Sequence, residues 1–411
     1  MRQGGPSMSE HAFRGTPFHE STSARCASPW WYSWGGYIVP DAYTDVHSEL
    51  EAIRSGVAMC EMSPIPRYEV SGPDAPACID YLIPRDASKM DVGCAWYTPW
   101  CSPDGKVVVD GIVFRFEHDR FVMSADRCET FLREHSRGFD VQISDVIDDF
   151  GILSLQGPRS REVLEAVTGE DWSDLRFSRV RSTTVAGAGV RVARQGFTGE
   201  LGYELWVDRP DGHEVWEAVA EAGAPFGIRP AGEYALEIAR VEAGIILISA
   251  DYTPAVPDVP STDNAPNPDD FVTPYELNLG HCVNLNKAAD FVGRAALEEE
   301  HRSGPRRRLV GLRFDLESVV GLFLAAGMAP DVSPRVRWDH MPLLVGDDVV
   351  GRASSVTWSP SASKLVGFGL VPSELAEIGT ELTVQWADYW GRELGPASAE
   401  VCPYPFIELK R

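Results

Sequence analysis

The sequence predicts an α+β protein of more than one domain, with an all-β domain at its C-terminal end. The chain has 411 residues, which is more than a single hydrophobic core usually holds. Helical and strand patterns are mixed up to about residue 303. From Arg308 onward, short strands with alternating apolar and polar residues follow one another, which is typical of a small barrel or sandwich. Residues 304–308, Gly-Pro-Arg-Arg-Arg, form a plausible linker.

The first 45 residues predict an arm. They are rich in Ser, Gly and Pro, and aromatic residues lie close together at Trp30, Trp31, Tyr32, Trp34 and Tyr37. Exposing aromatic side chains at that density is costly, so we expect the arm to lie across the body of the protein. It serves either as a packing arm or as one wall of a hydrophobic pocket, and the sequence favours neither.

Helix and strand signals follow in order along the chain. Caps, apolar periodicity and terminal glycines predict helices at 46–60, up to Leu82, and at 157–169, 211–223 and 233–244. Period-two patterns predict strands at 67–70, 94–101 and 106–114, a hairpin at 189–207, and strands at 309–314, 342–345, 349–358, 365–371 and 381–386. The proline-rich segment 253–274 predicts a long loop that shapes a site or is merely flexible.

Composition excludes several classes of partner and cofactor. The net charge of −24 makes nucleic acid and anionic membrane surfaces poor partners. No run of 18 apolar residues predicts a membrane span, and the start lacks the apolar core of a signal peptide, so a cytoplasmic protein is expected. The eight cysteines form no Cys-x-x-Cys pair, and the nine histidines form no cluster with ligand spacing. We therefore expect reduced thiols and no metal site.

The stretch from Val192 to Leu205 reads as a strand, a glycine-rich turn and a second strand. Its three glycines, at positions 196, 199 and 202, leave room for a flat ligand to lie against the turn. Phe197 offers an aromatic face and Glu204 a carboxylate. A carboxylate suits a ring that presents an amino group beside a ring N–H, as a pterin or guanine does. Read alone, the stretch is equally well an ordinary hairpin.

A second carboxylate, Asp110, lies in the middle of an otherwise apolar strand at 106–114. Burying a lone carboxylate is expensive, so Asp110 is either partnered or used in chemistry. Trp96, Tyr97 and Trp100 come just before this strand and are candidates for the lining of a pocket that holds a flat, apolar ligand.

Five ordered motifs resemble one family, the tetrahydrofolate-binding aminomethyltransferases, whose founding member is the T-protein of the glycine cleavage system. The resemblance covers about residues 46–405, and its motifs lie at 105–113, 155–158, 196–204, 240–244 and 290–297. It implies a three-lobed ring with a central folate site. Two α+β lobes would occupy residues 46–303 and a β-barrel residues 308–411, with the arm of residues 1–45 outside the resemblance.

The resemblance also implies roles for single residues. Asp110 matches the aspartate that faces the folate nitrogens, and Glu204 matches the glutamate that holds the pterin ring. Phe197 takes the place of an aromatic residue that packs against the ring, and Tyr97 is expected to contact the cofactor. Tyr234 stands where the family often has an arginine, so Arg240 or Arg229 is expected to make that contact. The implied cofactor is tetrahydrofolate, without a metal.

The expected donor of the one-carbon unit is a small aromatic molecule. A body this acidic would repel an acidic lipoyl carrier protein, so that partner is not expected. The pair of motifs at 275–280 and 291–294 resembles the sub-branch of aryl-ether O-demethylases and sesamin methylene transferase. Methyl and methylene transfer both remain open, with Tyr252 as the candidate acid at the ether oxygen or as a simple loop anchor.

Two further hypotheses stay open. The first keeps the folate but takes the carbon from a methylated amine, a sulfonium compound or an aminomethyl group. The second is a non-catalytic folate-binding factor, which the presence of Asp110 and the absence of a Lys-Gly-Cys-Tyr type motif make less favourable.

Overall fold

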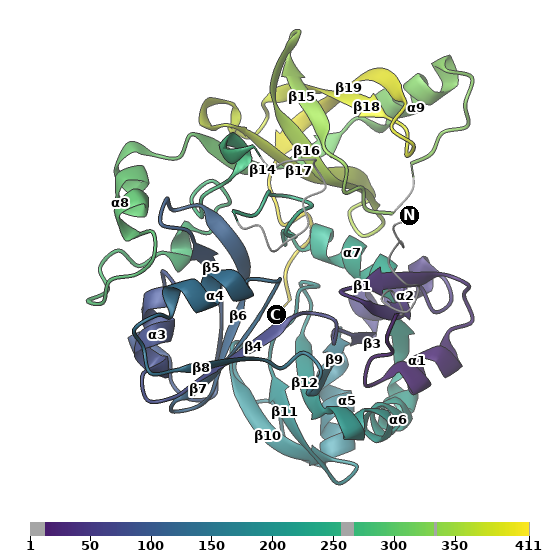
Figure 1. The fold of residues 1–411 in the computed structure, drawn as a ribbon. Helices are drawn as coiled ribbons and strands as arrows, with labels where there is room; N and C mark the ends of the chain where they lie inside the picture. Colours follow the sequence, from purple (N-terminus) through teal and green to yellow (C-terminus); the bar gives the residue numbers. More distant parts are fainter. Residues whose placement is uncertain (1–12, 256–266, 333–334, 411) are drawn as a thin grey trace, which may run out of the picture. The chain divides into compact units, whose positions relative to one another are not determined.

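The computed structural model describes residues 13–255, 267–332 and 335–410, and the chain divides into two compact units (Figure 1). The described part of the first unit consists of residues 13–67, 145–236 and 410. The second unit contains residues 68–144 and the described residues from 237 to 409. Residues 68–144 are thus inserted, in sequence, into the first unit.

The first unit is built on a six-stranded sheet whose strands lie in the order β10-β11-β12-β9-β3-β13. Strands β11 and β12 form the hairpin predicted from the sequence, with antiparallel pairing from Val190 opposite Val207 to Ala193 opposite Glu204. The bounds are β3 (Ala58–Glu61), β9 (Phe150–Gln156), β10 (Val180–Val185), β11 (Ala188–Ala193), β12 (Gly202–Asp208) and β13 (Arg229–Ala231).

Helices α5 (Ser160–Thr168) and α6 (Gly212–Gly223) lie beside strands β9 and β12 (Figure 1). Apolar residues of α5 and α6 recur with helical spacing, and every second residue of the strands faces them, which produces one shared core. This core contains Leu153, Leu155, Val163, Leu164, Tyr203, Leu205, Val215, Trp216 and Val219. Helix α2 (Val46–Ser55) begins at Asp45, whose side chain accepts a hydrogen bond from the Ser48 backbone N–H.

The described part of the predicted arm folds within the first unit. It forms helix α1 (His19–Arg25) and a two-stranded sheet of β1 (Trp31–Trp34) and β2 (Tyr37–Pro40). Tyr37 is 1% exposed, whereas Trp30 is 54% exposed. The cluster of aromatic residues is therefore divided between a packed side and a solvent-exposed side, and its role as a pocket wall stays a prediction.

The second unit contains a five-stranded sheet with the strand order β5-β6-β7-β4-β8. Antiparallel pairing joins β5 to β6 and β6 to β7, so β6 lies between two partners. The bounds are β4 (Arg67–Ser71), β5 (Cys94–Cys101), β6 (Val107–Glu117), β7 (Arg120–Ala125) and β8 (Gln142–Asp145), with helices α3 (Ala75–Leu82), α4 (Glu129–His135) and α8 (Arg294–Ser303). Helix α7 (Glu233–Glu242) begins in the first unit and continues in the second.

The C-terminal strands close into a six-stranded barrel in the order β14-β17-β16-β15-β18-β19, as the sequence predicts. Their bounds are β14 (Arg307–Phe314), β15 (Met341–Val345), β16 (Asp348–Ser359), β17 (Lys364–Pro372), β18 (Glu381–Ala387) and β19 (Glu393–Cys402). Two elements were not predicted. Helix α9 (Leu316–Ala325) packs Val319 and Phe323 into the barrel core, and β19 carries Gly395 and Pro396, which weaken its strand signal.

A buried ion-pair network joins α7 to the barrel within the second unit. The Arg240 guanidinium contacts the carboxylate of Asp251 at 2.8 Å and that of Glu237 at 3.0 Å. The side chain of Asp251 is fully buried, and its oxygens also accept hydrogen bonds from the hydroxyls of Ser354 and Ser355 on β16. A buried carboxylate with this many donors is compensated in place, so removing it leaves several groups unpaired.

We therefore expect Asp251→Asn to lower the free energy of unfolding by about 3–5 kcal/mol, because it breaks a buried ion pair and leaves the Arg240 charge uncompensated. Urea unfolding of the full chain measures the loss. The control is Glu129→Gln, which removes an exposed ion pair with Arg133 and should cost less than about 1 kcal/mol. Equal losses in the two variants would show that the Asp251 network contributes no special stability.

Candidate active site

Asp110 lies on β6 between two phenols of the same unit. The hydroxyl of Tyr97, on β5, donates a hydrogen bond to Asp110 Oδ2 at 2.6 Å, and the hydroxyl of Tyr252 donates to Oδ1. Tyr252 is fully buried, whereas Asp110 and Tyr97 are half-buried. The structure thus brings together three residues that the sequence analysis had singled out, and Asp110 and Tyr252 are 142 residues apart in the chain.

Burial and hydrogen bonding act in opposite directions on this group. Burial raises the pKa of the Asp110 carboxyl above its ordinary value, while the hydrogen bonds from Tyr252 and Tyr97 lower it. Burial, followed by the charge of Asp110, raises the pKa of each phenol well above its usual range. Both hydroxyls therefore remain protonated donors near neutral pH, and Tyr252 binds its proton tightly. The geometry makes Tyr252 a group that positions Asp110.

The alternation of β5 decides which aromatic residues share a face with Asp110. Asp110 is opposite Pro99 and Ile112 is opposite Tyr97, so these side chains project from one face of the sheet. Trp96 and Trp100 project from the other face, where Trp100 is fully buried and the Arg85 guanidinium lies over the Trp96 ring at 4.7 Å. Of the three aromatic residues expected to line one pocket, only Tyr97 lies on the face of Asp110.

Asp126 is a residue of this face that the sequence analysis missed. It comes one residue after β7, directly beyond the pair formed by Gly111 and Ala125. Continuing that register places Asp126 opposite Asp110. Counting from the turn at residues 118–119 would not have placed it there, because a bulge between Arg115 and Glu117 shifts the register of β6 and β7 by one residue.

Glu204 belongs to the first unit, where it lies on β12 opposite Ser154 of β9 and Ala193 of β11. It projects from the sheet face opposite to the core that contains Tyr203 and Leu205, and it is 9% exposed. Burial raises the pKa of Glu204 to about 7, against the opposing effects of the Trp206 side chain and the Arg67 charge. The surroundings leave the carboxylate short of compensating donors.

Two glycines of the glycine-rich turn are required by the packing of a neighbouring side chain, whereas the sequence suggested room for a ligand. A Cβ at Gly202 would lie 2.3 Å from the Gln156 amide nitrogen, and one at Gly196 would lie 2.5 Å from its oxygen. The side chain of Gln156 is buried and is held by Ser154 and Thr198. These two glycines therefore make room for Gln156, whereas the sequence analysis had reserved that room for a ligand. Phe197, in the same turn, is half-buried.

The structure also shows the surroundings of Arg240 and Arg229, the two candidates for the cofactor contact that an arginine often makes in the family. Arg240 is 3% exposed and lies in the ion-pair network with Asp251, which accounts for it without a ligand. Tyr234, at the position of the missing family arginine, is 7% exposed and lies with its ring centroid 6.4 Å from that of Trp30. Arg229 is exposed. The assignment of Arg240 to the cofactor stays a prediction.

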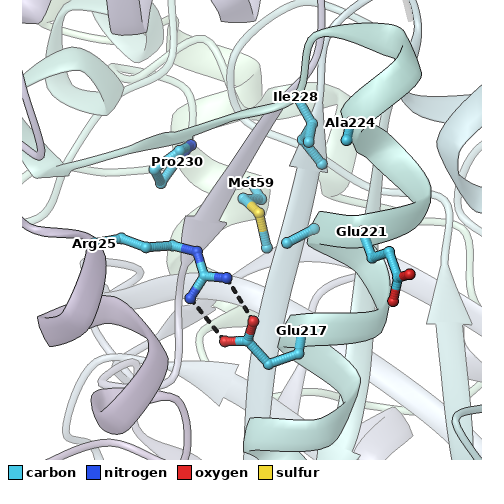
Figure 2. A pocket seen from close by; sticks show the side chains of 8 residues that line it. Arg25, Met59, Glu217, Glu221, Ala224, Ile228 and Pro230 are labelled. Atoms are coloured by element: carbon cyan, nitrogen blue, oxygen red, sulfur yellow. Dashed lines mark hydrogen bonds and ion pairs between the residues drawn. The ribbon is translucent and has the colours of Figure 1, made fainter.

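A separate surface pocket of about 370 Å³ opens in the first unit between α1, α6 and β13 (Figure 2). Arg25 and Glu217 form a bidentate ion pair at one side, and Met59 lies between them and the strand that carries Pro230. The lining residues are Arg25, Met59, Glu217, Ala220, Glu221, Ala224, Ile228 and Pro230. None of the predicted site residues is among them, so this pocket is not the candidate active site.

The described residues contain neither a metal-binding cluster nor a membrane-spanning helix. No group of three or more His, Cys, Asp or Glu residues in the described part of the chain is arranged to hold a metal ion. Among the same residues, no helix is long and apolar enough to cross a membrane. The proline-rich loop predicted at 253–274 lies partly outside the described residues, at 256–266.

Two stretches of the chain match known protein families. Residues 18–259 match the family described as the GCVT N-terminal domain, and residues 319–408 match the glycine cleavage T-protein C-terminal barrel domain. The chain belongs to the glycine cleavage T-protein family. Aminomethyltransferases of this family use tetrahydrofolate, which confirms the cofactor expected from the sequence.

Relatives agree over almost the whole chain. An aminomethyltransferase of Saccharopolyspora erythraea is 32% identical over 376 residues, which are 90% of this chain and 93% of the relative. One of Bacillus subtilis is 29% identical over 85% of this chain and 89% of its own. The crystal structure of aminomethyltransferase T from Bartonella henselae has a TM-score of 0.79 at 23% identity, covering 97% of this chain and 99% of that one. This likeness establishes the T-protein fold.

Each unit, taken by itself, contains a carboxylate whose chemistry fits tetrahydrofolate. A pterin ring donates through an amino group and an adjacent N–H, and the buried carboxylate of Glu204 lacks the donors that would return its pKa to the ordinary range. Asp110 supplies a carboxylate whose orientation two phenols fix. The role of Glu204 in holding the ring and the role of Asp110 at the reacting nitrogens both stay predictions, each made for its own unit.

We expect tetrahydrofolate to bind more tightly as the pH rises through 7. The ionised form of Glu204 is the acceptor, its pKa in the free protein is about 7, and ring donors stabilise the anion, so binding releases a proton. Calorimetry under anaerobic conditions should show affinity falling about tenfold per pH unit below 7. Glu204→Gln should weaken binding about 10- to 100-fold and abolish the pH dependence.

Glu61 provides a matched control for this experiment. Burial raises its pKa to about 7 as well, but its carboxylate accepts hydrogen bonds from Thr16 and Ser63 inside the first unit. Glu61→Gln should therefore leave the pH dependence of binding intact. If both variants kept that dependence, Glu204 would not be the group that holds the ring.

Proposed function

We propose that this protein is a tetrahydrofolate-dependent one-carbon transferase in which Asp110 manages the proton at the reacting nitrogen. The observation that carries the proposal is the Asp110 carboxylate held between the hydroxyls of Tyr97 and Tyr252. Bound tetrahydrofolate supplies a secondary amine that carries the one-carbon unit. The chain must then hold that amine in place and accept the proton that it gives up.

The contacts of Asp110 suit this task. Two donors on separate oxygens fix the plane of the carboxylate and keep it from rotating, while its half-buried position leaves it accessible to a proton donor. Tyr97 and Tyr252 keep their own protons, because burial and the Asp110 charge raise their pKa values. They therefore orient the base, and Asp110 is the one group of the three that is expected to exchange a proton with the bound amine.

For the donor we propose an aromatic ether, either a methylenedioxyphenyl or a methoxyphenyl compound, which would leave a catechol or a phenol. Its support is the motif pair at 275–280 and 291–294. Trp96 and Trp100 give it no support, because they project from the other face of β5. In this reading no acidic carrier protein needs to dock on the chain, whose net charge is −24.

The second candidate donor is an aminomethyl or methylated amino group. The relatives from Saccharopolyspora erythraea and Bacillus subtilis are named aminomethyltransferases, which is the observation that favours it. The proton chemistry assigned to Asp110 is the same for both donors, because in either case the nitrogen that gains the carbon must lose a proton.

The deciding assay incubates the protein anaerobically with tetrahydrofolate and one donor at a time, and identifies the folate product by mass. We expect a one-carbon adduct from an aryl ether, at the methylene level with a catechol or at the methyl level with a phenol. Asp110→Asn should lower the rate about 10²- to 10⁴-fold and leave folate binding nearly unchanged. Asp119→Asn, at the exposed far end of the same hairpin, is the control. No adduct from any ether or amine would refute the transferase.

We expect Tyr97→Phe and Tyr252→Phe to shift the acid limb of the pH–rate profile to higher pH. Each variant removes a donor that stabilises the Asp110 anion, and a hydrogen bond to a charged group is worth about 1.5–3 kcal/mol. That range corresponds to a rise of about one to two pH units. Tyr81→Phe, whose ring contacts Phe139 in the same unit, should leave the profile unchanged. An unshifted limb in all three variants would exclude the assigned role of the phenols.

A further inference from the structure

Asp126 follows directly after β7, and its carboxyl group lies close enough to Asp110 for the charge of Asp110 to act on it. Strands β6 and β7 pair Ile112 with Ser124 and Gly111 with Ala125, so the next step of the antiparallel register brings Asp110 opposite Asp126. Residues directly opposite each other in such a pair have their Cβ atoms about 4.5–5.5 Å apart and project to the same side. The two carboxyl groups therefore share one patch of the sheet.

Gly111 brings the strands especially close at this point. A Cβ at position 111 would lie 2.3 Å from the Ser124 carbonyl oxygen and 2.6 Å from the Ala125 Cβ. Only glycine fits between Asp110 and Ile112 without pushing β7, and with it Asp126, away from β6. The close approach of the two carboxyl groups is thus built into the backbone.

The two carboxyl groups have unequal partners. Asp110 accepts hydrogen bonds from both phenols, whereas Asp126 accepts none from the described residues. The other charges near the pair are those of Asp251, which raises the pKa of Asp110, and of Arg127, which lowers that of Asp126. The Arg85 guanidinium and the Cys282 thiol both donate hydrogen bonds to the backbone carbonyl oxygen of Tyr97.

Burial, followed by the charge of Asp110, raises the pKa of Asp126 to about 6. The pair consequently binds its first proton at a higher pH than an ordinary carboxyl group does, although two donors stabilise the Asp110 anion. A lone carboxylate with two phenol donors would be a weak base. Adding a second carboxylate opposite to it makes uptake of one proton more favourable, because that proton removes the repulsion between two anions.

We propose that Asp126 is a positioning residue that acts through Asp110, raising the proton affinity of the carboxyl pair so that the site accepts a proton near neutral pH. This inference rests on the proposed function. When an amine nitrogen forms a bond to the donor carbon, it releases one proton and the bond from that carbon to its leaving atom breaks. The pair takes up that proton, and the leaving atom departs with the electron pair and is protonated in turn. No oxidant or reductant is required.

The test begins without any ligand. Potentiometric titration of the free protein should show that wild type binds about one more proton than Asp126→Asn between pH 7 and pH 5. Glu61 and Glu204 titrate in the same range and cancel in the difference, since both variants keep them. Asp126→Glu should retain the uptake, and the exposed Asp119→Asn should show the wild-type curve in this range. Identical curves for wild type and Asp126→Asn would overturn the proposal.

Stability gives a second readout that does not depend on activity. A carboxyl whose pKa is raised by folding favours the folded state while it is protonated, and this contribution is lost as the pH rises through about 6. As the pH rises from 4 to 6, the melting temperature of Asp126→Asn should therefore increase relative to that of wild type. Above pH 6 the difference between the two melting temperatures should stay constant. A difference independent of pH would indicate a packing effect alone.

Once a donor is known, the pH–rate profile separates Asp126 from the phenols by sign. Asp126→Asn removes a negative charge, so the acid limb should move to lower pH by about one unit, opposite to the shift expected for Tyr97→Phe. A limb that stays in place would overturn the role of Asp126 and leave the proposed function intact. Absence of any transfer in wild type, with the proton uptake present, would refute the proposed function alone.

Discussion

The hydrogen bonds from Tyr97 and Tyr252 to Asp110 are the constraint on which the second unit's chemistry depends. A carboxylate in the middle of an apolar strand is unfavourable unless it is compensated, and the phenols compensate it from a strand and from a loop that are far apart in sequence. Because each phenol uses a different oxygen, the carboxylate is compensated and oriented by the same two contacts. Stability and function thus draw on one arrangement.

In the first unit, the two buried glutamates Glu204 and Glu61 have different hydrogen-bond partners. Glu204 lies on a sheet face without enough donors, whereas Glu61 accepts hydrogen bonds from Thr16 and Ser63. Burial raises the pKa of both to about 7, but two hydroxyls oppose it at Glu61, whereas the Trp206 side chain and the Arg67 charge oppose it at Glu204. A carboxylate that folding leaves partly uncompensated is more simply explained by a missing ligand than by packing. This contrast with Glu61 supports the prediction that Glu204 is the ring-binding group.

The fold was largely predictable from the sequence, and the site only in part. Strand periodicity and helix caps located the hairpin of β11 and β12, the helices α5 and α6, and five barrel strands, because these segments follow local rules. Helix α9 was missed although Asp315 caps it, and β19 was missed because Gly395 and Pro396 dilute its pattern. Asp110 could be singled out by its apolar surroundings. Its partners could not, since the contact with Tyr252 depends on tertiary structure, and the purpose of Gly196 and Gly202 depends on Gln156 in another strand.

The insertion of residues 68–144 into the first unit has a consequence for the order in which the chain folds. Strand β3 pairs with β9, about ninety residues later, and with β13, which ends at Ala231. The first unit's sheet therefore cannot be completed on the ribosome until more than half of the chain has emerged. Closing such long loops slows folding, and the unpaired edge of β3 is exposed meanwhile to pairing with other chains. Slow synthesis lengthens this interval and should favour aggregation through the N-terminal half, even though the completed fold places β3 between two partners.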